Sequence, residues 1–276
     1  MTQPTLTFHD GHTMPQFGLG LWQVDRDKAA DITRDAIEQG YRLIDGAWIY
    51  GNEDGQGAGV SASSVDRADI FVTSKVWSNG MSHDDVRNAV QASLDKMKLD
   101  YLDLMLLHWP FQDADVMVTA WKALIDARKD GQVRSVGVSN FHAHHLDRII
   151  GDTGVVPVLN QIEVSPRLQQ AEMRRVNASH GIITQSWTPL GQGRSFDAEP
   201  ITAAAARAGK TPAQVILRWH IQMGCSVIPR STKSERLAEN FDIFDFELTE
   251  QEMDAIATLD QGERTGPDPD QFDMKA

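Results

Sequence analysis

The chain has 276 residues, with 26 basic and 39 acidic side chains and a formal net charge of −13. This length exceeds that of most single domains but suits one α/β barrel. With 41% hydrophobic and 24% charged residues, the composition is that of a globular protein and excludes a fibrous or wholly disordered chain. The acidic excess argues against a nucleic-acid partner, because nucleic-acid recognition leaves a basic surface, and taken alone it also argues against a phosphorylated ligand.

The sequence shows no targeting or membrane segment. No apolar run approaches the roughly 18 residues that a membrane span needs. The segment Met1–Thr5 lacks the basic and apolar regions of a signal peptide. Cys225 is the only cysteine, which excludes an intramolecular disulfide and a zinc site built from cysteines. We therefore expect a cytoplasmic protein, monomeric, with no membrane partner.

The first predicted element is a hairpin, and eight strands follow it. Leu6–Phe8 and Thr13–Pro15 flank Asp10-Gly11, a pair typical of a tight hairpin turn, and we expect this hairpin to plug the barrel from outside. Short apolar runs, several of them rich in Val and Ile, then predict strands buried on both faces. These runs are Phe17–Leu21, Tyr41–Asp45, Ile70–Val76, Leu102–His108, Val133–Ser139, Val158–Ile162, Ile182–Trp187 and Ser226–Pro229.

Amphipathic helical patterns separate these strands. The clearest are Lys28–Gln39, Asp84–Lys98, the segment around Trp121 that ends at Gly131, the segment around Leu146–Ile150, and Gln169–His180. Eight strand–helix units in about 250 residues predict a (β/α)8 barrel of the TIM type, and the alternative is an open doubly wound sheet. We expect a single domain over residues 1–276, with a mobile, acidic and proline-interrupted tail from about residue 265 to residue 276.

The two common phosphate-binding motifs are absent. No G-x-G-x-x-G opens a helix after a strand, so a Rossmann dinucleotide site is unsupported. Gly209-Lys210-Thr211 resembles the end of a P-loop, but Ala204 replaces the required first glycine. Gly209 is better explained as a helix C-cap, and Thr211-Pro212 as the start of the next helix.

Three histidines lie close together in the sequence. His142, His144 and His145 come where a helix begins, and Asp147 is the only carboxylate nearby. We interpret them as solvent-exposed side chains and predict no metal site.

Polar side chains stand at the ends of the predicted strands, where barrel enzymes carry their reacting groups. Asp45 ends the second strand, Lys75 lies near the end of the third, and His108 ends the fourth. A lysine inside an apolar run is costly unless it is paired, and Asp45 is its natural partner. Tyr50 lies five residues beyond Asp45, where a neighbouring ammonium would lower its pKa from about 10. The alternative is a purely structural ion pair beside a rim aromatic.

In their sequence context these residues resemble the aldo-keto reductases. The tetrad Asp45, Tyr50, Lys75 and His108 lies within the family-like blocks Asp45–Glu53 and Leu106–Pro110. Further blocks that match the family are Gly137–Phe141, Asn160–Glu163, Trp187–Gly193 and Ile228–Asn240. The similarity runs in order and in spacing from about Leu6 to about Leu259, and it is greatest to the bacterial 2,5-diketo-D-gluconate reductases.

The resemblance implies an NADPH-dependent reduction of an aldehyde or ketone to an alcohol. Tyr50 would protonate the carbonyl oxygen, Lys75 held by Asp45 would tune Tyr50, and His108 would orient the carbonyl. In the cofactor site, the nicotinamide end would contact Ser139, Asn140, Gln161 and Trp187, and the loop after Trp187 would add Leu190 and Gln192. The 2′-phosphate would contact Arg230, Ser231, Thr232, Lys233 and Arg236, and the adenine would contact Glu239 and Asn240. The substrate wall would be Trp22, Ile49, Trp77 and Trp109, in a mouth that the short tail leaves less covered.

Three positions depart from the family pattern. Gly46 replaces a threonine near the cofactor ribose, Trp48 is bulkier than usual, and Arg230 replaces a lysine. Because every tetrad member is present, these departures do not put catalysis in doubt. They put in doubt the affinity for the cofactor and the range of substrates. Two other functions stay open: a lyase that forms a Schiff base on Lys75, and a nicotinamide-binding barrel with a regulatory role, against which the intact tetrad argues.

Overall fold

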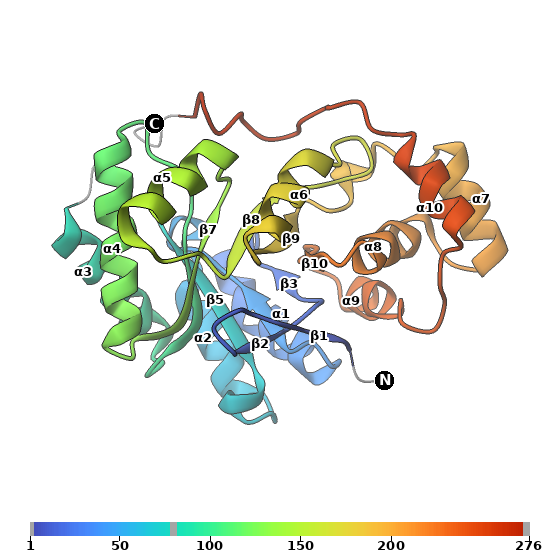
Figure 1. The fold of residues 1–276 in the computed structure, drawn as a ribbon. Coiled ribbons are helices and arrows are strands. Elements are labelled where there is room, and N and C mark those ends of the chain that lie inside the picture. The colour runs from blue at the N-terminus through green and yellow to red at the C-terminus, as the bar shows by residue number, and fades with distance from the viewer. Residues whose placement is uncertain (1–2, 78–81, 273–276) are drawn as a thin grey trace.

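Eight parallel strands form the centre of the part of the molecule that the computed structural model describes, residues 3–77 and 82–272. Neighbouring strands in the sequence are also hydrogen-bonded neighbours in the sheet, and a helix follows each strand (Figure 1). The strands are β3 (Leu19–Gly20), β4 (Leu43–Asp45), β5 (Phe71–Val76), β6 (Leu102–Leu107), β7 (Val133–Ser139), β8 (Leu159–Glu163), β9 (Ile183–Trp187) and β10 (Ser226–Val227).

The sheet closes on itself between its first and last strands. Phe17, just before β3, forms a parallel bridge with Val227 of β10. The backbone N–H of Gly18 donates to the carbonyl oxygen of Val227 at 2.9 Å, and that of Gly20 donates to the carbonyl oxygen of Pro229 at 3.2 Å. The predicted barrel is thereby confirmed, and the open doubly wound sheet is excluded because its edge strands would stay unpaired.

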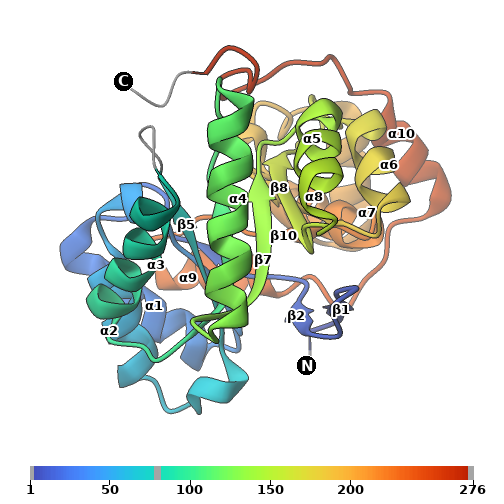
Figure 2. The same ribbon diagram turned by 60° about the vertical axis from the view of Figure 1, so that its left-hand side comes forward.

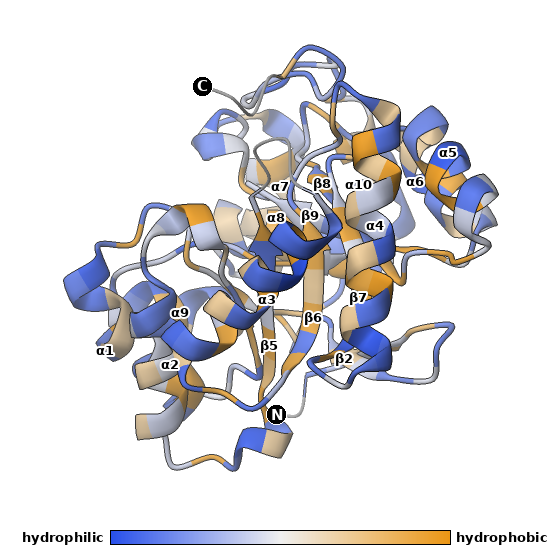
Figure 3. Cartoon of the chain, turned by 90° about the vertical axis from the view of Figure 1, so that its left-hand side faces the viewer, coloured by the Kyte–Doolittle hydropathy of each residue, from blue (hydrophilic) through white to orange (hydrophobic). Residues whose placement is uncertain are grey.

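Helices cover the outside of the barrel. Figure 3 shows the apolar residues running along β5 and β6, while α3 presents a hydrophilic surface. The helices are α1 (Arg26–Glu38), α2 (Glu53–Ala62), α3 (His83–Met97), α4 (Ala114–Lys129), α5 (Ala143–Thr153), α6 (Ala171–Ser179), α7 (Glu199–Ala208), α8 (Pro212–Gln222), α9 (Ser234–Phe241) and α10 (Glu250–Ala257). In the described part of the chain, none of them combines the length and apolarity needed to cross a membrane.

The sequence pattern did not predict α2, because three glycines in ten residues disfavour a helix. These glycines allow α2 to pack closely against its neighbours. A Cβ on Gly57 would lie 2.1 Å from the carbonyl oxygen of Met97, and a Cβ on Gly59 would lie 2.5 Å from that of Ala30. Only glycine therefore allows α2 to lie so close to α1 and to the end of α3.

The amino-terminal hairpin closes one end of the barrel, as predicted. Its strands β1 (Thr5–Thr7) and β2 (Thr13–Pro15) are antiparallel, and Gly11 in the turn has φ +91°. The side chains of Phe8 and Met14 are buried in one apolar cluster with Phe71 and Leu104 from the strands. The hairpin therefore covers the amino-terminal ends of the strands.

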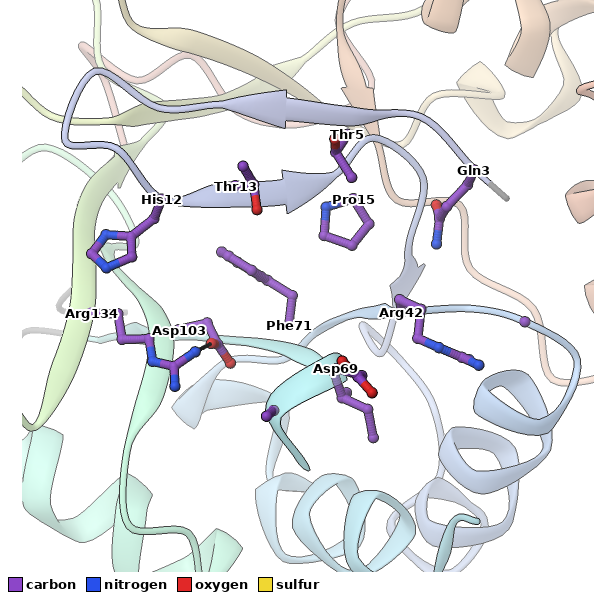
Figure 4. Close-up of a pocket in the computed structure, with 13 residues that line it drawn as sticks. Gln3, Thr5, His12, Thr13, Pro15, Arg42, Asp69, Phe71, Asp103 and Arg134 are labelled. Carbon is purple, nitrogen blue, oxygen red and sulfur yellow. Dashed lines mark hydrogen bonds and ion pairs between the residues drawn. The ribbon is translucent and has the colours of Figure 1, made fainter. Parts of the chain in front are cut away.

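A hollow of about 490 Å³ lies beside the hairpin (Figure 4). Its lining includes Arg42, Phe71, Asp103 and Arg134, at the starts of β4 to β7. The Asp103 carboxylate in it is paired with Arg134 at 3.1 Å and with Arg67 at 2.9 Å. Because reacting groups of barrel enzymes stand at the opposite ends of the strands, this hollow is not the active site.

The tail after α10 crosses the carboxyl-terminal end of the barrel, opposite the hairpin (Figures 1 and 2). Its backbone N–H groups at Thr265 and Gly266 donate to the buried carboxylate of Glu163 at 2.7 and 3.1 Å. Farther on, Gln112 donates to the carbonyl oxygen of Phe272 at 3.0 Å. The described part of the tail thus has defined partners, and its mobility stays a prediction.

Candidate active site

Four side chains converge at the carboxyl-terminal ends of β4, β5 and β6. Asp45 is the last residue of β4, Lys75 is the fifth of the six residues of β5, and His108 directly follows β6. The short 3-10 helix η1 (Trp48–Tyr50) returns Tyr50 over the same end. The structure therefore brings together the tetrad that the sequence predicted.

Lys75 is the centre of this group. Its ammonium donates to Asp45 Oδ2 at 2.6 Å, to the carbonyl oxygen of Gly46 at 2.8 Å and to Tyr50 Oη at 3.1 Å. Three acceptors use all three donors of the ammonium, which is fully buried. Since Tyr50 Oη accepts a hydrogen bond from Lys75, its own proton is free to be donated elsewhere.

The second oxygen of Asp45 is also satisfied. Gln161 donates from Nε2 to Asp45 Oδ1 at 2.8 Å and to Gln185 Oε1 at 2.6 Å. Burial disfavours the ammonium of Lys75, but Asp45 and Tyr50 together raise its pKa above the ordinary value. Lys75 is therefore charged, and both N–H groups of the Gln161 amide are already engaged within the protein.

The pKa of Tyr50 lies above its ordinary value of 10.0, because burial raises it more than Lys75 lowers it. The prediction from the sequence was right in the sign of the lysine's contribution and wrong in the net direction. A burial effect of this size depends on how the surrounding chain packs, which the spacing of residues does not reveal. Tyr50 consequently holds its proton throughout the neutral range.

His108 is a buried, neutral imidazole next to Tyr50. Burial, reinforced by the charge of Lys75, holds its pKa well below 6.5. Its ring lies 5.7 Å from that of Tyr50 and 5.2 Å from that of Trp77, both edge to face. Within the described residues its Nδ1 has no hydrogen-bond partner, which is unusual for a buried nitrogen and suits a group that contacts a ligand.

The predicted nicotinamide-end residues form one hydrogen-bonded network at the ends of β7, β8 and β9. Ser139 Oγ donates to the carbonyl oxygen of Gln161 at 2.8 Å. Asn140 Nδ2 donates to the carbonyl oxygen of His108 at 3.0 Å, and Trp187 Nε1 donates to Asn140 Oδ1 at 2.8 Å. Asn140 has φ +64°, a left-handed conformation that asparagine tolerates better than most residues. The network fixes the indole of Trp187 and links it to the backbone of His108.

The predicted phosphate-binding residues lie in the loop between β10 and α9, which carries Arg230 to Lys233, and in the first turn of α9, which carries Arg236. Arg230, Lys233 and Arg236 are exposed, and among the described residues none of them forms an ion pair with a carboxylate. Nearby Lys210, by contrast, is paired with Asp242 at 2.7 Å. Unpaired cations close to a helix start, on a chain of charge −13, fit a phosphate group.

The remaining predicted cofactor residues surround this cluster or the loop after β9. Thr232 is exposed, while Ser231 and Asn240 are buried. Three others lie at the surface or near it, namely Glu239, Leu190 and Gln192. Glu239 accepts a hydrogen bond from the Thr211 hydroxyl at 2.7 Å.

The predicted substrate-wall residues surround the tetrad. Trp22 is 49% exposed and its ring lies 5.0 Å from that of Tyr50, while Ile49 directly precedes Tyr50 and is also exposed. Trp77 contacts His108. Trp109 is buried beneath Phe272 of the tail, with ring centroids 4.3 Å apart.

Sequence reasoning missed Phe272. Its ring also lies 6.0 Å from that of Trp77, so the tail covers part of the mouth, which the short tail was expected to leave less covered. The segment was interpreted as mobile because it is acidic and rich in proline. The one signal was an aromatic residue in an otherwise polar stretch.

Sequence reasoning also missed Gln56, which occupies the space beside Gly46. Its Nε2 donates to the carbonyl oxygens of Ile44 at 3.2 Å and Thr73 at 3.1 Å. A Cβ on Gly46 would lie 2.0 Å from Gln56 Oε1, so the two residues depend on each other. Trp48, the other unusual residue nearby, lies against Lys96 of α3, whose Nζ is 5.2 Å from the ring, and does not line the tetrad.

The barrel and the tetrad together define a carbonyl oxidoreductase of the aldo/keto reductase type. The model of the Aldo/keto reductase family matches residues 14–261. The chain is 48% identical over 275 residues to the methylglyoxal reductase DkgA of Escherichia coli K12, covering 99% of each protein. It is 46% identical over 271 residues to an aldo-keto reductase of Mycolicibacterium smegmatis, covering 98% of each.

Solved structures of similar proteins support the same family. The apo form of Gox0644 has a TM-score of 0.95 and 44% identity, with 99% of this chain and 100% of that chain covered. A mutant of Gox0644, solved in complex with NADPH, has the same TM-score of 0.95, 43% identity and the same coverage. The chain belongs to the aldo/keto reductase family, and it is an oxidoreductase that acts on carbonyl compounds.

Proposed function

We propose that the protein reduces small aldehydes and ketones with NADPH, and that Tyr50 donates the proton. The observation that carries this proposal is the Tyr50 hydroxyl, which accepts from the Lys75 ammonium at 3.1 Å and so keeps its own proton free. His108, whose ring Nδ1 has no partner in the described part of the chain, lies directly beside it. Bound NADPH would supply the hydride that the carbonyl carbon accepts.

The chain's own residues would then handle the oxygen end of the reaction. Tyr50 passes its proton from Oη to the carbonyl oxygen. The Lys75 ammonium offsets the negative charge left on the phenolate, and Asp45 keeps that lysine in position. The neutral ring of His108 orients the carbonyl by a hydrogen bond. Gln161 acts at one remove, because it holds Asp45 rather than the substrate.

Preference for NADPH over NADH follows from the cluster of Arg230, Lys233 and Arg236. Guanidinium groups bind phosphate in a bidentate manner, and no described carboxylate competes for these three cations. The Trp187 indole, held by Asn140, offers a flat surface for the nicotinamide ring. These residues fit the cofactor that the Gox0644 mutant holds.

The substrate that fits best is a small dicarbonyl such as methylglyoxal, the substrate in the name of DkgA. Diketones similar to 2,5-diketo-D-gluconate are larger candidate substrates. The aromatic wall and the overlying Phe272 leave a mouth that favours compact molecules. We also propose that the protein works as a cytoplasmic monomer, which size-exclusion chromatography with light scattering would test for the oligomeric state.

A lyase that uses Lys75 is a weaker proposal. A Schiff base needs a neutral, accessible amine. Lys75 is instead fully buried, engaged with three acceptors, and has a raised pKa. Borohydride treatment with substrate should accordingly leave Lys75 unmodified.

The deciding experiment is Tyr50→Phe, with Tyr101→Phe as the matched control. Tyr101 lies between Arg67 and Arg134, far from the tetrad in the barrel. We expect Tyr50→Phe to bind NADPH normally by fluorescence titration and to lose at least about 100-fold in single-turnover reduction of methylglyoxal. The control should retain both properties. A single-turnover rate close to that of the unmodified protein would refute the assignment of Tyr50, and failure of the unmodified protein to bind NADPH would refute the cofactor.

A further inference from the structure

Three histidines and an aspartate from distant parts of the chain share one small space beside the mouth. His142, His144 and His145 lie at the start of α5, and Asp270 lies in the tail. One ring nitrogen of each histidine approaches the same atom, Asp270 Oδ1, at 3.0, 3.5 and 3.6 Å respectively. Asp147, the carboxylate that the sequence suggested as a partner, lies near His180 instead, at 4.0 Å.

These distances are close to those in a transition-metal site. Zinc bonds of about 2.0–2.2 Å at tetrahedral angles place neighbouring ligand atoms about 3.3–3.5 Å apart. The three separations from Asp270 Oδ1 span that range, and all four candidate ligand atoms lie within 4.8 Å of one another. Imidazole and carboxylate ligands together suit Zn²⁺ and its neighbours in the first transition series. Small side-chain movements would complete the geometry.

The hydrogen bonds indicate which atoms are ligands. His145 Nδ1 accepts the backbone N–H of His142 at 3.1 Å, so the proton of a neutral His145 ring is on Nε2. That nitrogen faces Asp270 Oδ1 at 3.6 Å but cannot bind a metal without losing the bond to His142. His142 Nδ1, His144 Nε2 and Asp270 Oδ1 remain as ligands, and His145 acts on the carboxylate from outside.

One neighbour opposes a cation at this place. Arg264 Nη2 lies 3.5 Å from His142 Nε2, and a His142 ring bound to metal through Nδ1 carries its proton on Nε2. The guanidinium must therefore turn away when a metal binds. Removing its charge should strengthen the site.

The position of Asp270 couples such a site to the mouth. Two residues farther along the tail, Phe272 packs on Trp109 and Trp77. Gln112 donates to the carbonyl oxygen of Phe272 and so holds the same stretch. Fixing Asp270 against α5 would hold Phe272 over the substrate wall.

We propose that His142, His144 and Asp270 bind a divalent transition-metal ion such as Zn²⁺, and that the bound ion fixes the tail over the mouth. The effect on turnover rests on the proposed function, whereas metal binding does not. Cys225, the only cysteine, is buried, so zinc has no accessible thiol on this chain.

The first test is calorimetric titration of the chelator-treated full chain with Zn²⁺, without NADPH or substrate. We expect one site, weakened at least about 10-fold in Asp270→Ala and in His144→Ala, since even outer partners of a metal site contribute about 10–100-fold. Arg264→Gln should bind more tightly. The control is His83→Ala, which removes a partly exposed histidine paired with Asp126. Equal affinity in the unmodified chain and Asp270→Ala, or no binding at all, would overturn the site.

The second test concerns the tail. Hydrogen exchange in the tail around Asp270 should slow on addition of Zn²⁺ in the unmodified chain and not in Asp270→Ala. Zn²⁺ should also lower kcat/KM for a bulky aldehyde more than for methylglyoxal, and Phe272→Ala should keep the zinc affinity but lose this difference. Inhibition that persists in Asp270→Ala would place the ion at the tetrad and refute the coupling. If the chain reduced no carbonyl compound, the calorimetric and exchange results would still decide the metal site.

Discussion

Gly46 and Gln56 form a pair whose interdependence can be tested directly. The perturbation is Gly46→Thr, which introduces the residue that the family pattern predicts at this position. The new Cβ would lie 2.0 Å from Gln56 Oε1 and 2.8 Å from Gln56 Cδ, so the Gln56 amide has to move. Moving it breaks the hydrogen bonds to the carbonyl oxygens of Ile44 and Thr73.

The cost can be calculated from those two bonds. Each buried hydrogen bond lost with its partner left in place costs about 1–3 kcal/mol, so the loss of both sets a range of about 2–6 kcal/mol, within which we expect Gly46→Thr to lower the free energy of unfolding by about 2–4 kcal/mol. Thr73 keeps the bond from the Gly46 backbone N–H at 3.0 Å, which holds the loss to the lower part of that range. In Gln56→Ala the clashing amide is absent, so adding Gly46→Thr to that variant should cost little.

The assay is urea unfolding followed by tryptophan fluorescence for both single variants and the double variant. We expect the double variant to be at least about 2 kcal/mol more stable than the sum of the single changes implies, a coupling within the range for residues in contact. Gly151→Thr is the control, because a Cβ there meets no atom of the described residues within 4 Å. Additive effects at Gly46 and Gln56, within about 0.5 kcal/mol, would refute the proposed packing.

Two further predictions follow from the charges. Arg236→Ala should weaken NADPH binding by about 10- to 100-fold and NADH binding far less, because a hydrogen bond to a charged group contributes about 1.5–3 kcal/mol. Fluorescence titration with each cofactor measures the two affinities. Equal losses for NADPH and NADH would refute the assignment of Arg236 to the 2′-phosphate. The rate of carbonyl reduction should stay flat through the neutral range and fall only above pH 10.0, because the acid must be protonated and burial raises the pKa of Tyr50 beyond that value. A step in kcat/KM near pH 6.5 that His108→Gln abolishes would contradict this profile, since the buried His108 has its pKa well below 6.5.

The sequence by itself determined the barrel and the composition of the tetrad. Strands buried on both faces must be apolar throughout, so their runs are legible in one dimension. A lysine inside such a run requires a partner, which led directly to Asp45 and then to Tyr50. The predicted strand boundaries differ from the observed ones by a few residues or less, as at β6 and β7. Helices α2, α9 and α10 have no counterpart among the predicted helices, and in α2 the reason is its glycines, which serve contacts with other helices.

Only the tertiary structure decided which groups meet across the carboxyl-terminal end of the barrel. Asp270 reaches His142 across 128 positions of the chain, and Phe272 reaches Gln112 across 160. Neither pairing leaves a periodic pattern, because each depends on where the tail crosses the closed barrel. The direction in which the pKa of Tyr50 is shifted likewise depends on how deeply the surrounding chain buries it. The local sequence pattern predicts strands, helices and the pairing of a lysine in an apolar run. Burial and long-range contacts, by contrast, exist only once the barrel has closed.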